Sequence, residues 1–320
     1  MRRNTLADYF QSVIARQGDY LVYDDGFRPR TYTYAALARA ARNLALKLES
    51  AGVGRGDRVV LWSENRPAWV AAFWACVLRG AAVAPIEQRH SPEFFARVVG
   101  ITSAKVVFLG DDVPPPDACP APVWKLSGLD WDSEPGPLAP VEAAPEDTVE
   151  ILFTSGATAE PKGVVITHRN ILANVVPVER EILKYLKYAR PFQPIRFLNL
   201  LPLSHMFGQA MTMFIPPMLA GTVVFQRSQA PVEIIRQIKL RRISVLVSVP
   251  KILEVLREYL VGVAPETAQR APVRTFGAAG FRKRIAQPGN QRETAGNLRN
   301  ARRLIVIEAA GLQQGRKGAL

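Results

Sequence analysis

The chain has 320 residues, of which 48% are hydrophobic, and a formal net charge of +13, so about two domains with a sizeable core are expected. Cys76 and Cys119 are far apart and match no metal or redox spacing, which favours a reducing compartment. Residues 1–13 lack the apolar core of a secretory signal. The apolar stretches 68–78 and 206–225 are too short, or too broken by proline and glycine, to span a bilayer. These features predict a cytoplasmic protein.

The first 110 residues alternate between helical and extended patterns. Thr33 is placed to cap a helix that Gly52 closes. Strands are predicted over 58–62, 82–86 and 105–109, with amphipathic or apolar helices between them. Strands alternating with helices are typical of a parallel sheet with both faces covered. We therefore expect an α/β fold of three layers, with mostly parallel sheets flanked by helices, over the first 260 residues.

A polar connection and a loop of unusual composition follow. Residues 112–145 are rich in proline and acidic residues and are predicted to be a surface connection. Residues 149–153 predict a buried strand, and 154–163 then concentrate hydroxyls, two glycines, one proline and Lys162. Backbone N–H groups and hydroxyls can surround phosphate oxygens, and a lysine adds positive charge. The loop is not a Walker loop, because Gly163 follows the lysine and a strand follows in place of a helix. The alternative is a turn-forming loop without a ligand.

This loop resembles the phosphate loop of the adenylate-forming (AMP-binding) superfamily, which includes acyl-CoA synthetases, luciferases and peptide-synthetase adenylation domains. The matching positions are Thr154, Ser155, Gly156, Thr158, Pro161, Lys162 and Gly163. The chain departs from the family pattern at Ala157, where a hydroxyl is lost, and at Ala159, where a glycine is lost. The resemblance implies that the loop binds ATP phosphates through Thr154, Ser155, Gly156, Thr158, Lys162 and Gly163. It also implies that Lys162 is catalytic, because it offsets the charge that develops on pyrophosphate.

The segment 200–208 resembles the next signature of the same family. Within it, the sequence Pro-Leu-Ser-His-Met-Phe-Gly most resembles that of the long-chain fatty-acid–CoA ligases. The resemblance implies that His205, Phe207 and Gly208 border the carboxylic acid and that His205 has a catalytic role in orienting it. A lone histidine beside apolar residues is more often a satisfied core residue, but the nearby phosphate loop favours the substrate role. His90 and His168 receive no role, and His168 is predicted to lie in the first turn of a helix capped by Thr167.

Beyond Val263 the resemblance is predicted to end. Residues 264–320 contain eleven basic and three acidic residues and two aromatics, a composition that favours a disordered tail with one plausible strand at 304–307. We therefore expect a partial AMP-binding domain over 1–263, the truncated N-terminal domain of the fold, and a basic tail over 264–320. The family's Tyr-Gly-x-Thr-Glu string, whose glutamate helps to hold Mg²⁺, its Thr-Gly-Asp string and its late lysine are not visible. No metal-binding residue is therefore assigned.

The resemblance implies ATP-dependent activation of a carboxylic acid, through an acyl-adenylate, for transfer to CoA. Because half of the family pattern is missing, the chain is expected to be incomplete, inactive alone, or split and completed by a separate C-terminal chain. Two alternatives stay open: a non-catalytic protein that binds ATP or an acyl group, and a nucleic-acid binder acting through Arg282-Lys283-Arg284 and Arg302-Arg303. The tail lacks the aromatic residues of a single-strand platform, so no DNA partner is expected. Peripheral membrane contact also stays open.

Overall fold

The structure, a computed structural model, describes residues 3–154, 161–189, 193–263, 275–277 and 305–308. The helices are α1 (Leu6–Ile14), α2 (Tyr34–Ser50), α3 (Pro67–Leu78), α4 (Pro92–Thr102), α5 (His168–Ala189), α6 (Met206–Gln209), α7 (Ile215–Met218), α8 (Pro231–Leu240) and α9 (Pro250–Val263), with a 3₁₀ turn η1 (Leu126–Gly128) and a π turn η3 (Ala210–Phe214). The strands are β1 (Asp19–Asp24), β2 (Pro29–Thr33), β3 (Arg58–Ser63), β4 (Ala82–Glu87), β5 (Val106–Leu109), β6 (Val123–Lys125), β7 (Thr148–Thr154), β8 (Lys162–Thr167), β9 (Arg196–Asn199), β10 (Thr222–Gln226), β11 (Val245–Ser248), β12 (Thr275–Gly277) and β13 (Ile305–Glu308).

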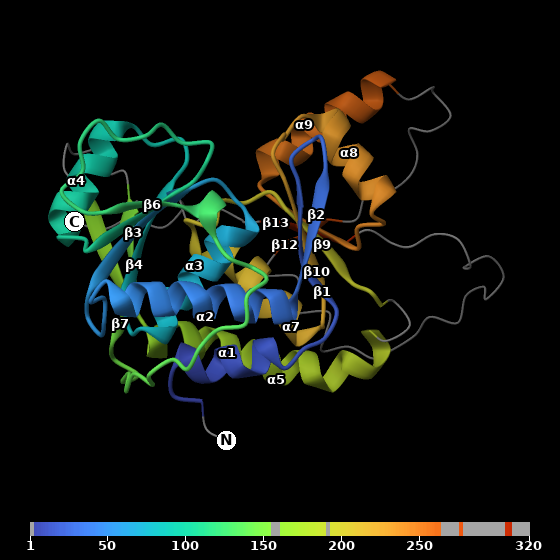
Figure 1. Cartoon of the computed structure of the whole chain (residues 1–320). Helices are drawn as coiled ribbons and strands as arrows, with labels where there is room; N and C mark the ends of the chain where they lie inside the picture. Colours follow the sequence, from blue (N-terminus) through green and yellow to red (C-terminus); the bar gives the residue numbers. More distant parts are fainter. Residues whose placement is uncertain (1–2, 155–160, 190–192, 264–274, 278–304, 309–320) are drawn as a thin grey trace, which may run out of the picture.

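These strands form two sheets (Figure 1). Sheet 1 has the order β6-β5-β3-β4-β7-β8 and is parallel except for β8, which pairs with β7 antiparallel. Sheet 2 has the order β12-β13-β11-β9-β10-β1-β2 and is parallel except for β2, which pairs with β1 antiparallel. In both sheets the antiparallel strand lies at an edge.

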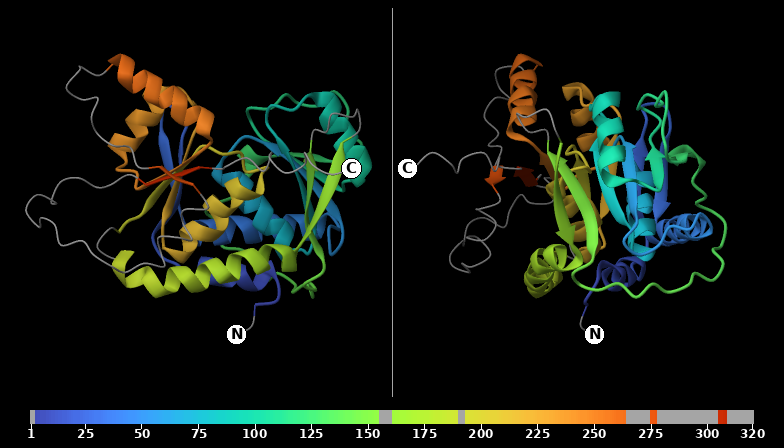
Figure 2. Two further views of the ribbon diagram at one scale, coloured as in Figure 1. Left: turned by 180° about the vertical axis from the view of Figure 1, so that it is seen from behind. Right: turned by 90° about the vertical axis from the view of Figure 1, so that its left-hand side faces the viewer.

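Helix α3 lies between the two sheets and explains why they stay together. Its residues 67–77 are all buried, because the helix is apolar on every side and has no face suited to water. It contacts β3 and β4 of sheet 1 and β1 of sheet 2. On the outer faces, α4 covers sheet 1, where Phe95 stacks on Trp62 at 4.8 Å between ring centroids, and α8 and α9 cover sheet 2 (Figure 2). Each sheet thus has helices on both faces, and the predicted α/β class with three-layer, mostly parallel sheets is confirmed.

The two predicted helix caps are present. Thr33 Oγ1 accepts a hydrogen bond from Ala36 N at 3.0 Å at the start of α2. Thr167 Oγ1 accepts one from Asn170 N at 3.2 Å at the start of α5. His168, in the first turn of α5 as predicted, is buried, and its Nδ1 accepts a hydrogen bond from Leu6 N at 3.0 Å. This histidine therefore joins α1 to α5.

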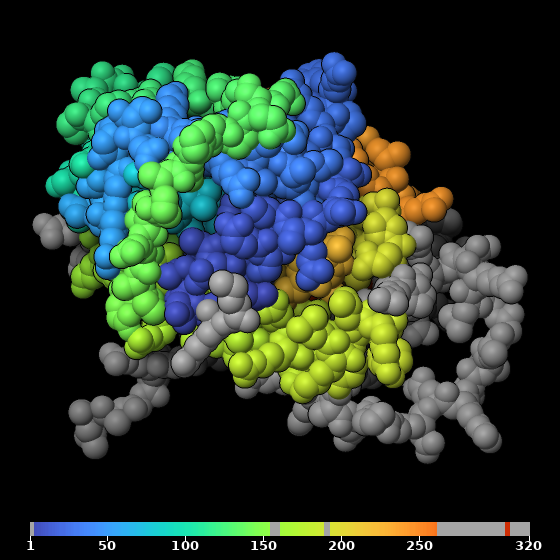
Figure 3. Space-filling model, turned by 60° about the horizontal axis from the view of Figure 1, so that its bottom comes forward, coloured from blue at the N-terminus to red at the C-terminus, as the bar shows by residue number. Residues whose placement is uncertain are grey.

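Residues 112–145 run over the surface, as predicted, and the part after β6 crosses α2 as an extended strap (Figure 3). Asn43 Nδ2 donates to Ser133 O at 2.8 Å, and the rings of Tyr32 and Trp131 lie 4.1 Å apart. The connection also contributes β6 to the edge of sheet 1, which the polar composition did not indicate.

Two short strands lie within residues 264–320, and β13 confirms the strand predicted over 304–307. Strand β13 pairs in parallel with β11, with Val245 opposite Ile305, and β12 pairs with β13. Val306 is only 2% exposed, since this apolar run covers an edge of sheet 2 that would otherwise be unpaired. Strand β12 was not expected from the sequence. The rest of this segment lies outside the described residues, and the domain boundary at Val263 stays a prediction. Among the described helices, none combines the length and the apolar character needed to cross a membrane.

Candidate functional site

The hairpin of β7 and β8 carries the predicted phosphate loop. Thr154 pairs with Lys162 and Phe153 with Gly163, so both ends of the loop are fixed by the strand register. Lys162 is exposed, and its ammonium forms no ion pair with a described residue. Ser155, Gly156 and Thr158 belong to 155–160, which lie outside the described residues. The proposed role of the loop in binding phosphate therefore stays a prediction.

Gly163 is needed for packing within this hairpin. A Cβ atom at this position would lie 2.9 Å from Ile151 Cγ2 and 3.2 Å from Phe153 Cε1, both on the facing strand. Within β7 only Val149 and Glu150 are buried, whereas Ile151, Leu152 and Phe153 are half-buried. The expectation of a fully buried strand over 149–153 is corrected in this respect.

Strand register places the loop at a definite edge of sheet 1. Strands β4 and β7 are parallel, with Val83 opposite Glu150, so Glu87 and Thr154, each four residues further on, end at the same edge. Ligands of open α/β sheets bind outside the carboxyl ends of the strands. Thr154 and Lys162, the described residues on either side of the loop, therefore lie at this carboxyl edge.

The side chain of His205 lies at the same edge of sheet 1, next to Glu87. Its Nε2 lies 3.6 Å from Glu87 Oε2, and its side chain is 65% exposed, so it is not a satisfied core histidine. The interaction with His205 is the main reason why the pKa of Glu87 lies below its ordinary value, against burial, which raises it. His90, which received no role, stacks on Phe94 at 4.0 Å, and partial burial lowers its pKa.

Two asparagines hold the segment 200–208 in place. Asn199, buried at the end of β9, donates from Nδ2 to Gly208 O at 3.0 Å and to Thr212 Oγ1 at 2.6 Å, and its Oδ1 accepts from Leu201 N at 3.0 Å. Asn65, after β3, donates to Leu201 O at 2.7 Å and accepts from Leu203 N at 2.8 Å. The segment between β9 and α6 is therefore a rigid, hydrogen-bonded turn.

The two other residues assigned to the acid have clear structural surroundings. Phe207 is half-buried and packs against the central core. Gly208 is buried, and a Cβ on it would lie 2.2 Å from Pro202 O, so no larger residue fits without moving the backbone. Their contact with a substrate stays a prediction.

A buried polar pair lies directly beneath this segment. Gln209, the last residue of α6, donates from Nε2 to Glu150 Oε1 of β7 and to Leu203 O at 3.0 Å. Burial raises the pKa of Glu150 to about 8, against an opposing effect of the hydrogen bond from Gln209. The pair connects the hairpin strand to the segment that bears His205.

Sequence reasoning missed Asn65, Asn199, Glu150 and Gln209. A signal was present for Glu150, which is the one charged residue within the apolar run 149–153, and for Asn199, which interrupts the apolar run 197–201. The partners of these side chains come from distant parts of the chain, so the sequence did not indicate their contacts.

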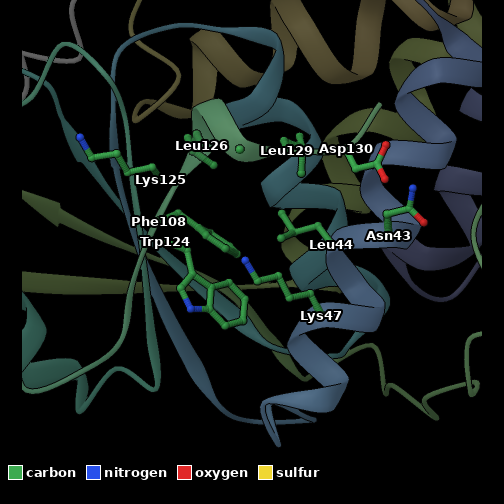
Figure 4. Close-up of a pocket in the computed structure, with 10 residues that line it drawn as sticks. Asn43, Leu44, Lys47, Phe108, Trp124, Lys125, Leu126, Leu129 and Asp130 are labelled. Atoms are coloured by element: carbon green, nitrogen blue, oxygen red, sulfur yellow. The ribbon is translucent and has the colours of Figure 1, made fainter. Parts of the chain in front are cut away.

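Two hollows lie in the part of the chain that the structure describes, and the larger one extends along the hairpin to Phe153 and Gly163, next to the loop. One of about 780 Å³ is lined by residues at the amino ends of β3, β4 and β7, including Arg55, Arg58 and Asp147, and by the outer face of the hairpin. The other, of about 100 Å³, is shown in Figure 4, where Lys47 of α2 lies over the ring of Trp124 at 4.4 Å. The second is smaller than the few hundred Å³ typical of a ligand site. Within the described part of the chain, no three His, Cys, Asp or Glu residues are grouped so that they could hold a metal ion.

Comparison with known families agrees with this geometry. The family model described as AMP-binding enzyme matches residues 10–298. The chain belongs to this family. The match continues past Val263, so the expected end of the resemblance at that residue is wrong.

The similar curated proteins act on varied acids. The chain is 30% identical over 178 residues to 4-coumarate–CoA ligase 2 of Oryza sativa subsp. japonica, covering 46% of this chain and 31% of that protein. It is 30% identical over 158 residues to a fatty acid–[acyl-carrier-protein] ligase of Streptomyces coeruleorubidus, covering 45% and 30%. It is 27% identical over 272 residues to feruloyl-CoA synthase of an Amycolatopsis species, covering 75% and 50%. The chain thus spans half or less of the length of these relatives.

Solved structures share the fold. O-succinylbenzoate coenzyme A synthetase from Bacillus subtilis, in complex with AMP, superposes with a TM-score of 0.65 at 21% identity, covering 83% of this chain and 66% of that one. The relatives as a group are acyl- and aryl-CoA ligases and adenylation domains, and they do not single out long-chain fatty acids.

Proposed function

We propose that this chain supplies the ATP- and acid-binding part of a ligase that activates a carboxylic acid as its acyl-adenylate, for transfer to CoA. Family membership supports the reaction type. The observation that carries the proposal is the shared carboxyl edge of sheet 1, where the end of the β7 strand and the Glu87–His205 pair lie in register. Phosphates and acid must meet at one phosphorus atom, so their binding groups have to share one edge.

The residues divide the work as follows. The hydroxyls of Thr154, Ser155 and Thr158, with the backbone of Gly156 and Gly163, donate to the phosphates of ATP. A carboxylate oxygen of the acid attacks the α-phosphorus, and the bond to pyrophosphate breaks. Lys162 offsets the negative charge that collects on the leaving pyrophosphate. The family resemblance also implies Mg²⁺, but the described residues hold no ligand set for it, and no step here runs through the metal.

For the acid, we propose a long-chain fatty acid. The support is the wording of residues 202–208 and the presence of a fatty acid ligase among the relatives. His205 orients the carboxylate and is itself oriented by Glu87, while Phe207 and Gly208 border the apolar tail. A cytoplasmic location is part of this proposal, supported by the sequence features given above.

A second proposal concerns completeness. Because the chain spans only 30% to 50% of these curated relatives, we propose that it binds ATP but does not complete acid–CoA ligation unless a C-terminal chain is added. The alternative is a protein that only binds ATP or an acyl group. Such a protein would not carry out acid–CoA ligation even when a C-terminal chain is added.

The test compares the purified chain with Lys162→Ala and with Lys239→Ala, an exposed lysine on α8 outside sheet 2. Wild type and Lys239→Ala are expected to bind ATP weakly, and Lys162→Ala is expected to lose this binding. Equal binding by all three proteins would contradict the phosphate role. Pyrophosphate release is then measured with ATP, Mg²⁺ and a panel of fatty and aromatic acids. Acid-dependent release by the chain alone, lost in Lys162→Ala, would refute the proposed incompleteness and support the reaction.

A further inference from the structure

Glu150 and Gln209 form a buried pair in which two oxygen atoms have no partner. Both residues are 0% exposed. Gln209 Nε2 donates to Glu150 Oε1 and to Leu203 O, and this uses both of its hydrogens. Glu150 Oε2 and Gln209 Oε1 are left without a hydrogen-bond partner among the described residues.

An ionised Glu150 does not fit these surroundings. Its Oε2 would carry negative charge in the protein interior, and the pair would then contain two acceptors and no donor from a described residue. A proton on Oε2 turns one of these acceptors into a donor, and Gln209 Oε1 is the acceptor left over in the same pair. One proton on Oε2, donated to Gln209 Oε1, would therefore satisfy both unpartnered atoms.

Charged neighbours do not change this conclusion. The elements beside Glu150 carry Glu87 at the end of β4, Lys162 at the start of β8 and His205 before α6. Glu87 and Lys162 lie four register positions from Glu150, at the carboxyl edge. None of the three contributes to the pKa of Glu150, which burial raises to about 8.

We propose that Glu150 is a neutral carboxylic acid in the native protein and forms a two-point pair with the Gln209 amide, and that this pair positions the segment 200–208 against the hairpin strand. In this pair Gln209 Nε2 donates to Glu150 Oε1, and Glu150 Oε2 donates to Gln209 Oε1. The second Nε2 hydrogen holds Leu203 O, two residues before His205. Glu150 lies four residues before Thr154, where the phosphate loop begins.

Glu150 is thus a positioning residue that acts through Gln209. The contribution of Glu150 to catalysis rests on the proposed function, because Glu150 sets the distance between the groups assigned to the phosphates and the groups assigned to the acid. Loss of the proton at alkaline pH would place two acceptors against each other and loosen the segment 200–208. The pair itself can be tested without ATP, acid or turnover, so its failure is distinguishable from failure of the proposed function.

The protonation state is read from the infrared difference spectrum between about pH 6.5 and about pH 9.5. Ordinary carboxyl groups are ionised at both values, so a carboxylic acid C=O band lost on raising the pH reports a group with a raised pKa. Wild type and the exposed control Glu142→Gln are expected to lose such a band, and Glu150→Gln is expected to show none. In Gln209→Met the band should move to higher frequency, because its C=O loses a hydrogen bond. No band in wild type, or the same band in Glu150→Gln, would overturn the proposal.

The positioning role is read from hydrogen exchange of the peptide 200–209, corrected for the intrinsic effect of pH. This peptide contains the Leu201 and Leu203 amides held by Asn199 and Asn65. Its protection is expected to fall about tenfold or more in wild type above pH 8 and to stay constant in Glu150→Gln, where two amides can form the same two-point pair. The strand 58–63 serves as the internal control. A band without any change in the exchange of 200–209 would refute the positioning role. Should Glu150→Gln fail to fold, wild type and Gln209→Met decide the outcome.

Discussion

Replacing Glu150 with glutamine should change how the stability of the protein depends on pH. The carboxyl has an ordinary pKa of 4.5, and burial raises it to about 8 in the folded chain. The folded state therefore keeps a proton that the unfolded state has released. The stability that this proton gives is fully present below pH 4.5 and is lost as the pH rises through about 8. Glutamine occupies the same space without titrating.

The size of the effect follows from the shift. One pKa unit corresponds to about 1.36 kcal/mol, so the full difference between wild type and Glu150→Gln is on the order of 5 kcal/mol. Between pH 6 and pH 8 the free energy of unfolding of wild type should fall, relative to the variant, by roughly 2 kcal/mol. Above the folded pKa the difference should become constant.

Urea unfolding followed by tryptophan fluorescence measures this difference, because Trp62, Trp69 and Trp74 are fully buried. Glu142→Gln, at an exposed position, is the matched control and should show no such dependence on pH. A difference between wild type and Glu150→Gln that stays constant from pH 6 to pH 8 would refute the reasoning. It would mean that Glu150 is ionised in the folded protein and has a partner outside the described residues.

Three further outcomes are expected. Gly208→Ala should lower the free energy of unfolding, measured by urea titration, by about 1–3 kcal/mol, because the new Cβ would lie 2.2 Å from Pro202 O. In the same titration the control Gly128→Ala should change it by less than about 0.5 kcal/mol, because no atom lies within 4 Å of a Cβ at that position. Asn199→Ala should cost about 2–3 kcal/mol and expose the Leu201 amide to hydrogen exchange, because three buried hydrogen bonds are lost; unchanged exchange would contradict this. His205→Ala should raise the pKa of Glu87 toward 4.5 in a carbon NMR titration of labelled glutamate, and no change would show that the pair does not form in solution.

Local patterns were sufficient for most of the fold. The period of apolar residues and the caps at Thr33 and Thr167 depend on neighbours within one or two turns, so they could be read without knowing tertiary contacts. The strap 112–145 shows the limit of this reading. Its polar composition predicted a surface path, but β6 joins sheet 1 because Val123 pairs with Val107, a partner that only the folded chain provides.

The candidate site divides in the same way. His205 and Lys162 are exposed polar residues beside connecting segments, His205 before α6 and Lys162 at the start of β8, and family resemblance assigned them roles. Glu150 sits inside a strand whose apolar neighbours made it look like part of the core. A buried carboxyl is tolerated there only because Gln209, 59 residues later in the sequence, meets it. A charged residue that interrupts an apolar strand therefore indicates that a polar partner for it lies elsewhere in the chain. Here the partner, Gln209, lies on α6, next to the turn that carries His205, so this contact joins the β7–β8 hairpin to the segment 200–208.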